Sequence, residues 1–234
     1  MKILSLDSTA LVASVALCED EARLGEITIE NGNTHSETLL PMVEFLLQRF
    51  SITTDEIDLF AISAGPGSFT GVRIGAATAK GLAFGTEKPC VGVSTLEALA
   101  YNLRMHDGLI CPVMNARRKQ VYTALFRAKD GKLERLMPDS AIAITELDER
   151  LSLYSEPIRL CGDGYEITKE LLKHPILPTA QNMCQQSAYS VAQVARIAFE
   201  NGQSVSDLEL APTYLRLSQA ERERAERMGI DTGI

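Results

Sequence analysis

The glycine-rich stretch Gly65-Pro66-Gly67-Ser68 is a place in this chain where residue types and spacing could support chemistry. It follows the apolar run 59–62 and precedes a helical pattern, and a strand, a glycine turn and a helix N-terminus together can bind an anion. The stretch lacks the Gly-Lys-Ser/Thr ending of a phosphate-binding loop, and Pro66 has no amide hydrogen to donate. We therefore interpret it as a structural turn, with Ser68 as the N-cap of the helix that follows.

The serine and histidine residues do not form the motif of a hydrolase or of a metal site. Ser68 directly follows Gly67, so the G-x-S-x-G motif of serine hydrolases is not matched. His35, His106 and His174 are too far apart in sequence to hold a metal ion from one element, and only the fold could bring them together. We therefore disfavour a protease or esterase, and we expect neither a metal nor a cofactor.

Composition narrows the class of protein further. The chain has 234 residues, a formal charge of −8 and five scattered cysteines. Without a C-x-x-C pair these cysteines are typical of reduced thiols, and with no signal peptide or membrane-spanning run we expect a cytoplasmic protein. An acidic chain grips nucleic acid poorly on its own, because phosphate contacts dominate such affinity. If its function involves RNA, we expect a partner to hold the RNA.

The elements that position these residues follow a repeated order. Apolar runs and helical patterns predict the order β-β-β-α-β-α twice, hence an α/β protein with two lobes and a cleft. The first copy has strands 3–6, 11–17, 24–29 and 59–62 with helices 35–50 and 71–85, and the second has strands 109–114, 120–126, 133–137 and 158–160 with helices 146–153 and 166–173. Further helices are predicted at 94–103 and 187–200.

We place the N-terminal lobe at residues 1–106 and the C-terminal lobe at 107–217. The last helix and the final segment of the second lobe could pack back on the first. Residues 218–234 form a charged tail, and within it 220–227 consists almost entirely of Glu and Arg, a pattern typical of a solvated, fraying helix.

The helix predicted at 71–85 has two contrasting sides. Its small residues recur every four positions and therefore stack along one side, which we expect to pack inward. These residues are Gly71, Gly75, Ala79 and Ala83. A second stripe combines two cations with an aromatic residue, which suggests a surface that something else covers. This stripe contains Arg73, Ala77, Lys80 and Phe84.

The helix predicted at 35–50 gives a similar indication. Its core-facing stripe is predicted to contain Leu39, Leu40, Val43, Leu46, Leu47 and Phe50. Phe45 falls outside that stripe, close to Met42, and both are residue types enriched at interface cores. We therefore predict a partner or dimer interface made of Met42, Phe45, Arg73, Ala77, Lys80 and Phe84.

The whole chain resembles a known family. The duplicated order resembles the actin-like ATPase superfamily, which shares the ribonuclease-H-like fold. More specifically, the motifs ILSLDST (3–9), HSETLLP (35–41), AGPGSFTGVRIG (64–75), STLEALA (94–100), RRKQVY (117–122) and PTYLR (212–216) resemble the TsaB family. These matches span nearly all of the chain. At Asn115 the sequence departs from the family pattern, which usually has Asp before Ala-Arg.

The resemblance implies a role in tRNA modification. TsaB-like proteins are non-catalytic relatives of the transferase TsaD, with which they pair through their N-terminal lobes, and TsaE is a further partner. The complex makes threonylcarbamoyladenosine at adenosine 37 (t6A37) of tRNAs that read ANN codons. The resemblance therefore implies a scaffold without cofactor, a homodimer in isolation, and contact with tRNA only through the complex. The alternative is a stand-alone metal- or ATP-dependent hydrolase of the same fold, resembling a glycoprotease.

The superfamily binds phosphate at two turns, and both are altered in this sequence. The first turn contains Asp7, Ser8 and Thr9 but no glycine, and these three residues are candidates for a vestigial phosphate site. The second turn, 115–119, is bulky and basic. The segment Gly162-Asp163-Gly164 is either a remnant of the adenosine-side glycine pair or a strand-to-helix turn. The resemblance, with these changes, makes efficient ATP turnover unexpected.

Overall fold

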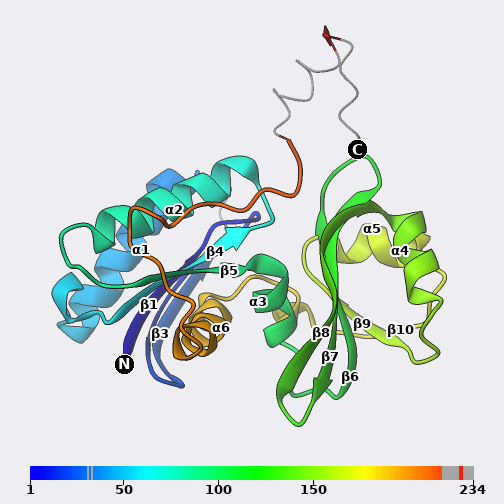
Figure 1. The fold of residues 1–234 in the computed structure, drawn as a ribbon, viewed down its shortest axis with the longest axis horizontal. Helices are drawn as coiled ribbons and strands as arrows, with labels where there is room; N and C mark the ends of the chain where they lie inside the picture. The colour runs from blue at the N-terminus through cyan, green and yellow to red at the C-terminus, as the bar shows by residue number, and fades with distance from the viewer. Residues whose placement is uncertain (31, 33, 218–226, 229–234) are drawn as a thin grey trace.

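Two five-stranded sheets with the same strand order form the two lobes of the molecule (Figure 1). In this computed structural model the described residues are 1–30, 32, 34–217 and 227–228. The first sheet has the order β3-β2-β1-β4-β5 and contains β1 (Lys2–Asp7), β2 (Ala13–Glu19), β3 (Ala22–Ile29), β4 (Leu59–Gly65) and β5 (Cys90–Ser94). The second has the order β10-β9-β6-β7-β8 and contains β6 (Gly108–Asn115), β7 (Gln120–Lys129), β8 (Lys132–Ala143), β9 (Ile158–Cys161) and β10 (Ile176–Leu177).

The pairing directions are also the same in both sheets. The first three strands of each sheet pair antiparallel, and the last two join through parallel pairings. The predicted duplication and the α/β fold class are therefore confirmed. The sequence pattern missed β5 and β10, which complete the parallel side of each sheet.

Six α-helices cover the sheets. They are α1 (His35–Phe50), α2 (Phe69–Ala83), α3 (Thr95–Tyr101), α4 (Ile144–Leu151), α5 (Tyr165–Leu171) and α6 (Ala188–Glu200), as counted over the described part of the chain. All six were predicted, α1 with the same bounds and the others with shifted ends. The helix predicted within the charged tail lies mostly outside the described residues. No described helix is both long enough and apolar enough to cross a bilayer.

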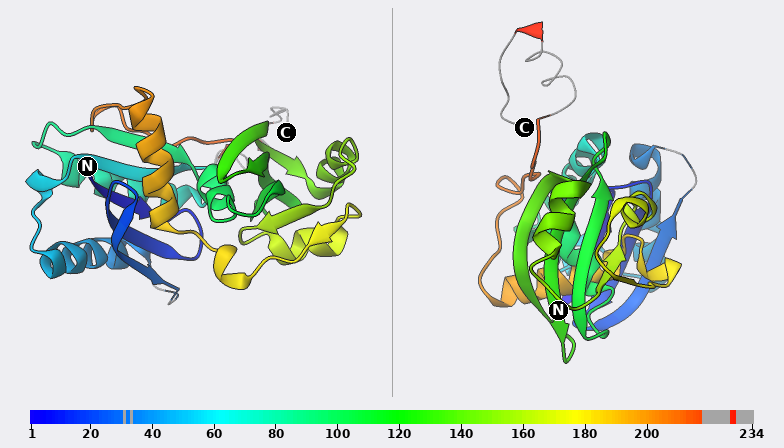
Figure 2. Two further views of the ribbon diagram at one scale, coloured as in Figure 1. Left: turned by 90° about the horizontal axis from the view of Figure 1, so that it is seen from below. Right: turned by 90° about the vertical axis from the view of Figure 1, so that its right-hand side faces the viewer.

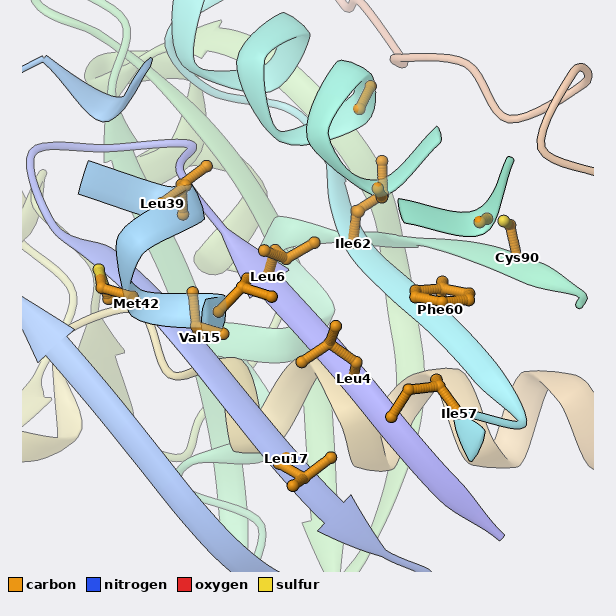
Figure 3. Packing of buried hydrophobic residues seen from close by; sticks show 14 of the residues in the cluster. Leu4, Leu6, Val15, Leu17, Leu39, Met42, Ile57, Phe60, Ile62 and Cys90 are labelled. Atoms are coloured by element: carbon orange, nitrogen blue, oxygen red, sulfur yellow. The ribbon is translucent and has the colours of Figure 1, made fainter. Parts of the chain in front are cut away.

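One face of the first sheet packs against α1 and α2. Alternate residues of β1, β2 and β4 point to this face, as the period of two in a strand requires. The cluster includes Leu4, Leu6, Val15, Leu17, Phe60 and Ile62 from the strands, with Leu39 and Met42 from α1 (Figure 3).

The opposite face of the first sheet packs against α6, although α6 follows the second lobe in the sequence. The chain returns from the second lobe into α6 (Figure 2, left), where Ala188, Val191 and Ala195 pack on Ile3 and Ala61. After α6, Val205 pairs with Cys90 of β5. Residues 188–213 therefore pack largely against the first lobe, although they follow the second lobe in the sequence.

The second lobe has its own core, and α3 lies between the lobes. Helices α4 and α5 cover one face of the second sheet, around Val113, Leu125 and Leu147. Leu96 and Leu99 of α3 pack on the other face. Because α3 also contacts α6, the two sheets are joined through packed helices.

Candidate functional site

The turn after β1 is filled by its own side chains. Asp7 Oδ1 accepts hydrogen bonds from the Thr9 amide at 2.9 Å and the Thr9 hydroxyl at 2.7 Å. Asp7 Oδ2 accepts from the hydroxyl of Ser63, on β4, at 2.5 Å. Asp7, Ser8 and Thr9 are each no more than 2% exposed. The structure therefore brings the three candidates for a phosphate site together, but it uses their polar atoms internally.

The start of α2 closes this turn from outside. The Ser8 hydroxyl donates to the Gly71 carbonyl oxygen at 2.8 Å, and the Ser68 amide donates to the Thr9 carbonyl oxygen at 2.7 Å. A Cβ on Gly71 would lie 1.9 Å from the Ser8 carbonyl oxygen, so glycine is required by this close approach. Ser68 accepts a bond from the Gly71 amide, which confirms its predicted N-cap role. The glycine-rich stretch is a structural turn.

Burial sets the ionisation of Asp7. Removal of its carboxyl group from water raises the pKa, and the hydrogen bonds from Ser63 and Thr9 oppose this effect in part, as does the nearby charge of His35. The His35 ring itself forms a hydrogen bond with the Ala10 carbonyl oxygen through Nε2, at 2.7 Å. His35 is thus engaged at the N-terminus of α1, the position that the sequence predicted for it.

The second turn, between β6 and β7, is a strained hairpin. Arg117, Arg118 and Lys119 all have left-handed backbones, with φ of 63°, 53° and 59°. Such a conformation costs about 1–2 kcal/mol for each residue other than glycine. Asn115 supports the hairpin, because its side-chain oxygen accepts from the Arg117 amide at 2.8 Å. That contact gives Asn115 a structural role at the position where the sequence departs from the family pattern.

The segment Gly162-Asp163-Gly164 packs directly on β6. Gly162 has a φ of +103°, and a Cβ there would lie 2.2 Å from the Val113 carbonyl oxygen. Asp163 Oδ1 accepts from the Asn115 amide at 3.0 Å, and burial raises the pKa of the Asp163 carboxyl. Of the two interpretations left open by the sequence, this geometry favours a strand-to-helix turn that leads into α5.

A cavity of about 410 Å³ lies between the lobes. Its walls come from the turn after β1, the end of β3, the Gly162–Glu166 region and the segment before α6. The charged side chains of its lining are Glu30, Asp163 and Glu166, and no Lys or Arg appears among the described lining residues. Such walls repel a polyphosphate, because like charges held close together raise the free energy of binding.

The predicted outward stripe of α2 does face outward, but its cations are engaged. Arg73, Ala77 and Phe84 are exposed and Lys80 is half-buried, whereas the small row Gly71, Gly75, Ala79 and Ala83 is buried, as predicted. The final segment, residues 205–217, runs along this helix (Figure 1). Lys80 Nζ donates to the carbonyl oxygens of Leu208 at 3.0 Å and Leu210 at 3.1 Å.

Tyr214 of the final segment forms a clasp with the first two turns of α2. Its ring stacks on Phe69, with centroids 4.4 Å apart, and its hydroxyl accepts from Arg73 Nε at 2.9 Å. The Arg73 guanidinium also lies 4.1 Å from the Phe69 ring centroid. Phe69 and Tyr214 were not among the predicted site residues. The available signal was the stripe of cations beside an aromatic residue, which suggested a covered surface. We assigned that cover to a partner, whereas the chain's own final segment bonds both cations.

The predicted orientation of Met42 is wrong. Met42 is 4% exposed and packs in the core beneath α1 (Figure 3), while Leu40, assigned to the core, is 45% exposed. The physical reason is helical geometry, because Met42 lies four residues before buried Leu46 and so on the same side, whereas Leu40 lies about 120° away from Leu46. Phe45 is 59% exposed, as expected.

The described residues contain no group of three or more His, Cys, Asp or Glu side chains that could hold a metal ion. His35 and His174 each bond a backbone carbonyl oxygen, that of Ala10 and that of Glu156. All five cysteines are free thiols. The fold therefore does not bring the histidines together into a cluster.

Comparisons with known proteins agree in pointing to one pathway. Residues 29–223 match the family model described as TsaD, tRNA N6-adenosine threonylcarbamoyltransferase. A Bacillus subtilis protein named tRNA threonylcarbamoyladenosine biosynthesis protein TsaB is 33% identical over 97% of this chain and 99% of its own length. The Escherichia coli protein of that name is 29% identical over 92% of this chain and 95% of its own length.

A crystal structure supports the same similarity. It is a Pseudomonas aeruginosa protein described as similar to the peptidase YeaZ, and it covers 92% of this chain and 99% of its own, with a TM-score of 0.81 and 25% identity. A transferase from Methylorubrum extorquens, named tRNA N6-adenosine threonylcarbamoyltransferase, is 33% identical over 70% of this chain but over only 52% of its own length.

Proposed function

Because the chain belongs to the TsaB family of tRNA threonylcarbamoyladenosine biosynthesis proteins, we propose that it is a non-catalytic subunit that supports TsaD. In this proposal TsaD transfers the threonylcarbamoyl group to adenosine 37 of tRNAs that read ANN codons. TsaE joins the larger complex, and the chain works in the cytoplasm. The tRNA is held by the complex rather than by this chain alone, whose formal charge is −8.

The closed turn after β1 carries the non-catalytic part of the proposal. A phosphate-binding turn needs donors that point at the ligand. Here the Thr9 amide points at Asp7, and the Ser8 hydroxyl is bonded to Gly71. A carboxylate whose oxygens already accept three hydrogen bonds, with α2 packed over the turn, is poorly placed to act on a nucleotide. The acidic lining of the interlobe cavity supports the same conclusion.

The outer face of α1 and α2 is our proposed contact with TsaD. Phe84 is 76% exposed and Phe45 is 59% exposed, and Ala77 lies on the outward side of α2. Arg73 and Lys80 are held by the final segment, so they lend this face a fixed shape. Met42 contributes from beneath by supporting α1. A TsaD chain of the same fold offers an equivalent pair of helices, so a homodimer and the heterodimer compete for this face.

The experiment is a reconstitution with purified components. The chain alone is assayed for ATP hydrolysis and bound metal, and then with TsaD, TsaE, tRNA and the threonylcarbamoyl donor for t6A formation. We expect no turnover above blank by the chain alone and t6A formation only when it is added to its partners. ATP turnover by the pure chain that disappears in an Asp7→Asn variant would instead support a stand-alone hydrolase and overturn the proposal.

A further inference from the structure

The β6–β7 hairpin presents three consecutive cations, Arg117, Arg118 and Lys119, to solvent. A left-handed backbone at all three positions would suit glycine or asparagine, yet the sequence has long basic side chains there. Backbone strain of this kind persists where the surrounding structure enforces it, and it concentrates at functional positions. The hairpin therefore stands out from the other turns of the described chain.

The hairpin is held firmly by its neighbours. The Ala116 amide donates to the Gln120 carbonyl oxygen and the Gln120 amide to the Arg117 carbonyl oxygen, both at 3.0 Å. The first amide of α4, that of Ile144, donates to the Lys119 carbonyl oxygen at 3.2 Å. Such bonds fix the direction in which the three side chains leave the backbone, and this reduces the entropy lost when they bind a ligand.

The final segment supplies a fourth cation next to the hairpin. Arg216 donates from Nη1 to the Ala116 carbonyl oxygen at 2.9 Å, which brings the final segment against the base of the hairpin. The hairpin lies at the end of the second sheet where the final segment passes (Figure 1). The opposite end of that sheet carries the β7–β8 turn. We call Arg117, Arg118, Lys119 and Arg216 the basic cluster.

The chemistry of the basic cluster suits an extended polyanion better than a bound nucleotide. The amides of Ala116, Arg117 and Gln120 already bond within the hairpin, so these three donors are not directed at a single phosphate. The neighbouring cavity is lined by carboxylates, so a triphosphate is not drawn inward. Several cations on the outside of a firm hairpin instead match successive phosphates of a nucleic acid backbone.

We infer that the basic cluster contacts the phosphodiester backbone of the tRNA once this chain is assembled with TsaD. The inference rests on the proposed function, because the affinity of so acidic a chain for RNA is expected to be weak without its partner. The contact carries no sequence information and acts to position the tRNA, since phosphates are the same in every sequence.

The test compares two variants with the same change of charge. Arg117→Gln/Lys119→Gln removes two cations from the hairpin, and Lys129→Gln/Lys132→Gln removes two exposed lysines from the opposite end of the sheet. Each is purified, checked for thermal unfolding and for assembly with TsaD, and then titrated with tRNA over a series of salt concentrations. We expect the hairpin variant to assemble normally, to bind tRNA at least about fivefold more weakly at low salt, and to lower the salt slope by about 1.5. The control variant is expected to match the wild type.

Other outcomes overturn the inference. An unchanged affinity and slope in an assembled hairpin variant would mean that the tRNA passes elsewhere, while the proposed function would stand. An equal loss in both variants would reveal only an effect of net charge. Binding of ATP to the chain alone that is lost in the hairpin variant would assign the cluster to a free nucleotide. If the wild-type chain does not assemble with TsaD, the proposed function itself fails, and this is measured before any tRNA is added.

Discussion

Ser8 donates its hydroxyl hydrogen to the carbonyl oxygen of Gly71 over 2.8 Å, and this bond joins the turn after β1 to the first turn of α2. The two backbones approach so closely that a Cβ on Gly71 would lie 1.9 Å from the Ser8 carbonyl oxygen. The glycine thus serves packing, and the packing closes the turn in which Asp7, Ser8 and Thr9 were predicted as a vestigial phosphate site. The contact between Ser8 and Gly71 therefore links the glycine-rich stretch to our proposal that the chain is a non-catalytic subunit.

Replacement of Gly71 by alanine is expected to destabilise the fold. The added methyl group meets backbone atoms, which cannot move aside as a flexible side chain can, so we expect a loss of about 1–3 kcal/mol in the free energy of unfolding. Gly81→Ala is the matched control, because nothing lies within 4 Å of a Cβ there and alanine favours the helix by about 1 kcal/mol. Urea unfolding measures both. Equal stability of the two variants would contradict the close approach.

The carboxyl group of Asp7 predicts a pH dependence of stability. Burial raises the pKa of Asp7 above its ordinary value of 3.8, so the folded chain retains a proton that the unfolded chain has lost. The contribution of Asp7 to stability therefore declines as the pH rises from about 4 through the folded pKa. An asparagine in place of Asp7 would be neutral at every pH, and its amide can replace the contacts with Thr9 and Ser63.

We expect the Asp7→Asn variant to gain stability relative to the wild type as the pH rises, with the difference becoming constant above the folded pKa. Urea unfolding from about pH 4 to about pH 8 measures the difference. Parallel curves for the two proteins would mean that the pKa of Asp7 is not raised by folding. A variant that weakens with increasing pH would mean that the three hydrogen bonds outweigh the cost of burial.

Periodicity predicted the duplicated fold but not all of its strands. β5 was missed because Gly92 resembles a break, whereas in the sheet it is needed since a Cβ there would lie 2.9 Å from the Ala64 Cβ. β10 has two residues, Ile176 and Leu177, between prolines, which is too short for any period to register. The small row of α2 was predicted correctly because a spacing of four has only one geometric meaning in a helix.

The candidate site was less predictable because its contacts join distant parts of the chain. The face of Met42 was misjudged because the apolar residues Leu40 and Leu47 shifted the predicted stripe around the helix, whereas Met42 lies within the stripe that is actually buried. Phe69 and Tyr214, which form the clasp, are far apart in the sequence, so no local pattern predicts that their rings stack. The hydrogen bond from Ser8 to Gly71 likewise depends on how the turn after β1 packs against the start of α2. No local sequence pattern encodes that packing.

The final segment is expected to loosen when Lys80 is shortened. Lys80 Nζ bonds the carbonyl oxygens of Leu208 and Leu210, so a Lys80→Ala variant loses both bonds at once. We expect amide hydrogen exchange over residues 206–213 to accelerate about tenfold, a loss of about 1.4 kcal/mol of local stability. Lys169→Ala is the control, since this lysine lies on α5 of the second lobe, where it contacts the Tyr165 ring. Unchanged protection in the Lys80 variant would mean that Leu210 and Thr213 hold the segment without it.

The outer face of α2 gives the sharpest test of assembly. Ala77 is exposed on the side of α2 that also carries Phe84, and a glutamate there would be tolerated by the isolated fold. In a contact that excludes water, the same carboxylate would be buried without a partner, which is costly. We expect Ala77→Glu to weaken binding to TsaD and self-association by at least about a hundredfold, or about 2.7 kcal/mol, while thermal unfolding stays unchanged.

The control for this prediction lies on the opposite side of the first sheet. Ile197 is 43% exposed on α6, so Ile197→Glu also introduces a carboxylate at an exposed apolar position, but away from α1 and α2. Size-exclusion chromatography with light scattering, run with and without TsaD, compares the two variants with the wild type. The predicted pattern is loss of both assemblies in Ala77→Glu and retention in Ile197→Glu. If the two effects are reversed, the partner binds through α6, and if Ala77→Glu assembles like the wild type, the face of α1 and α2 is not the contact.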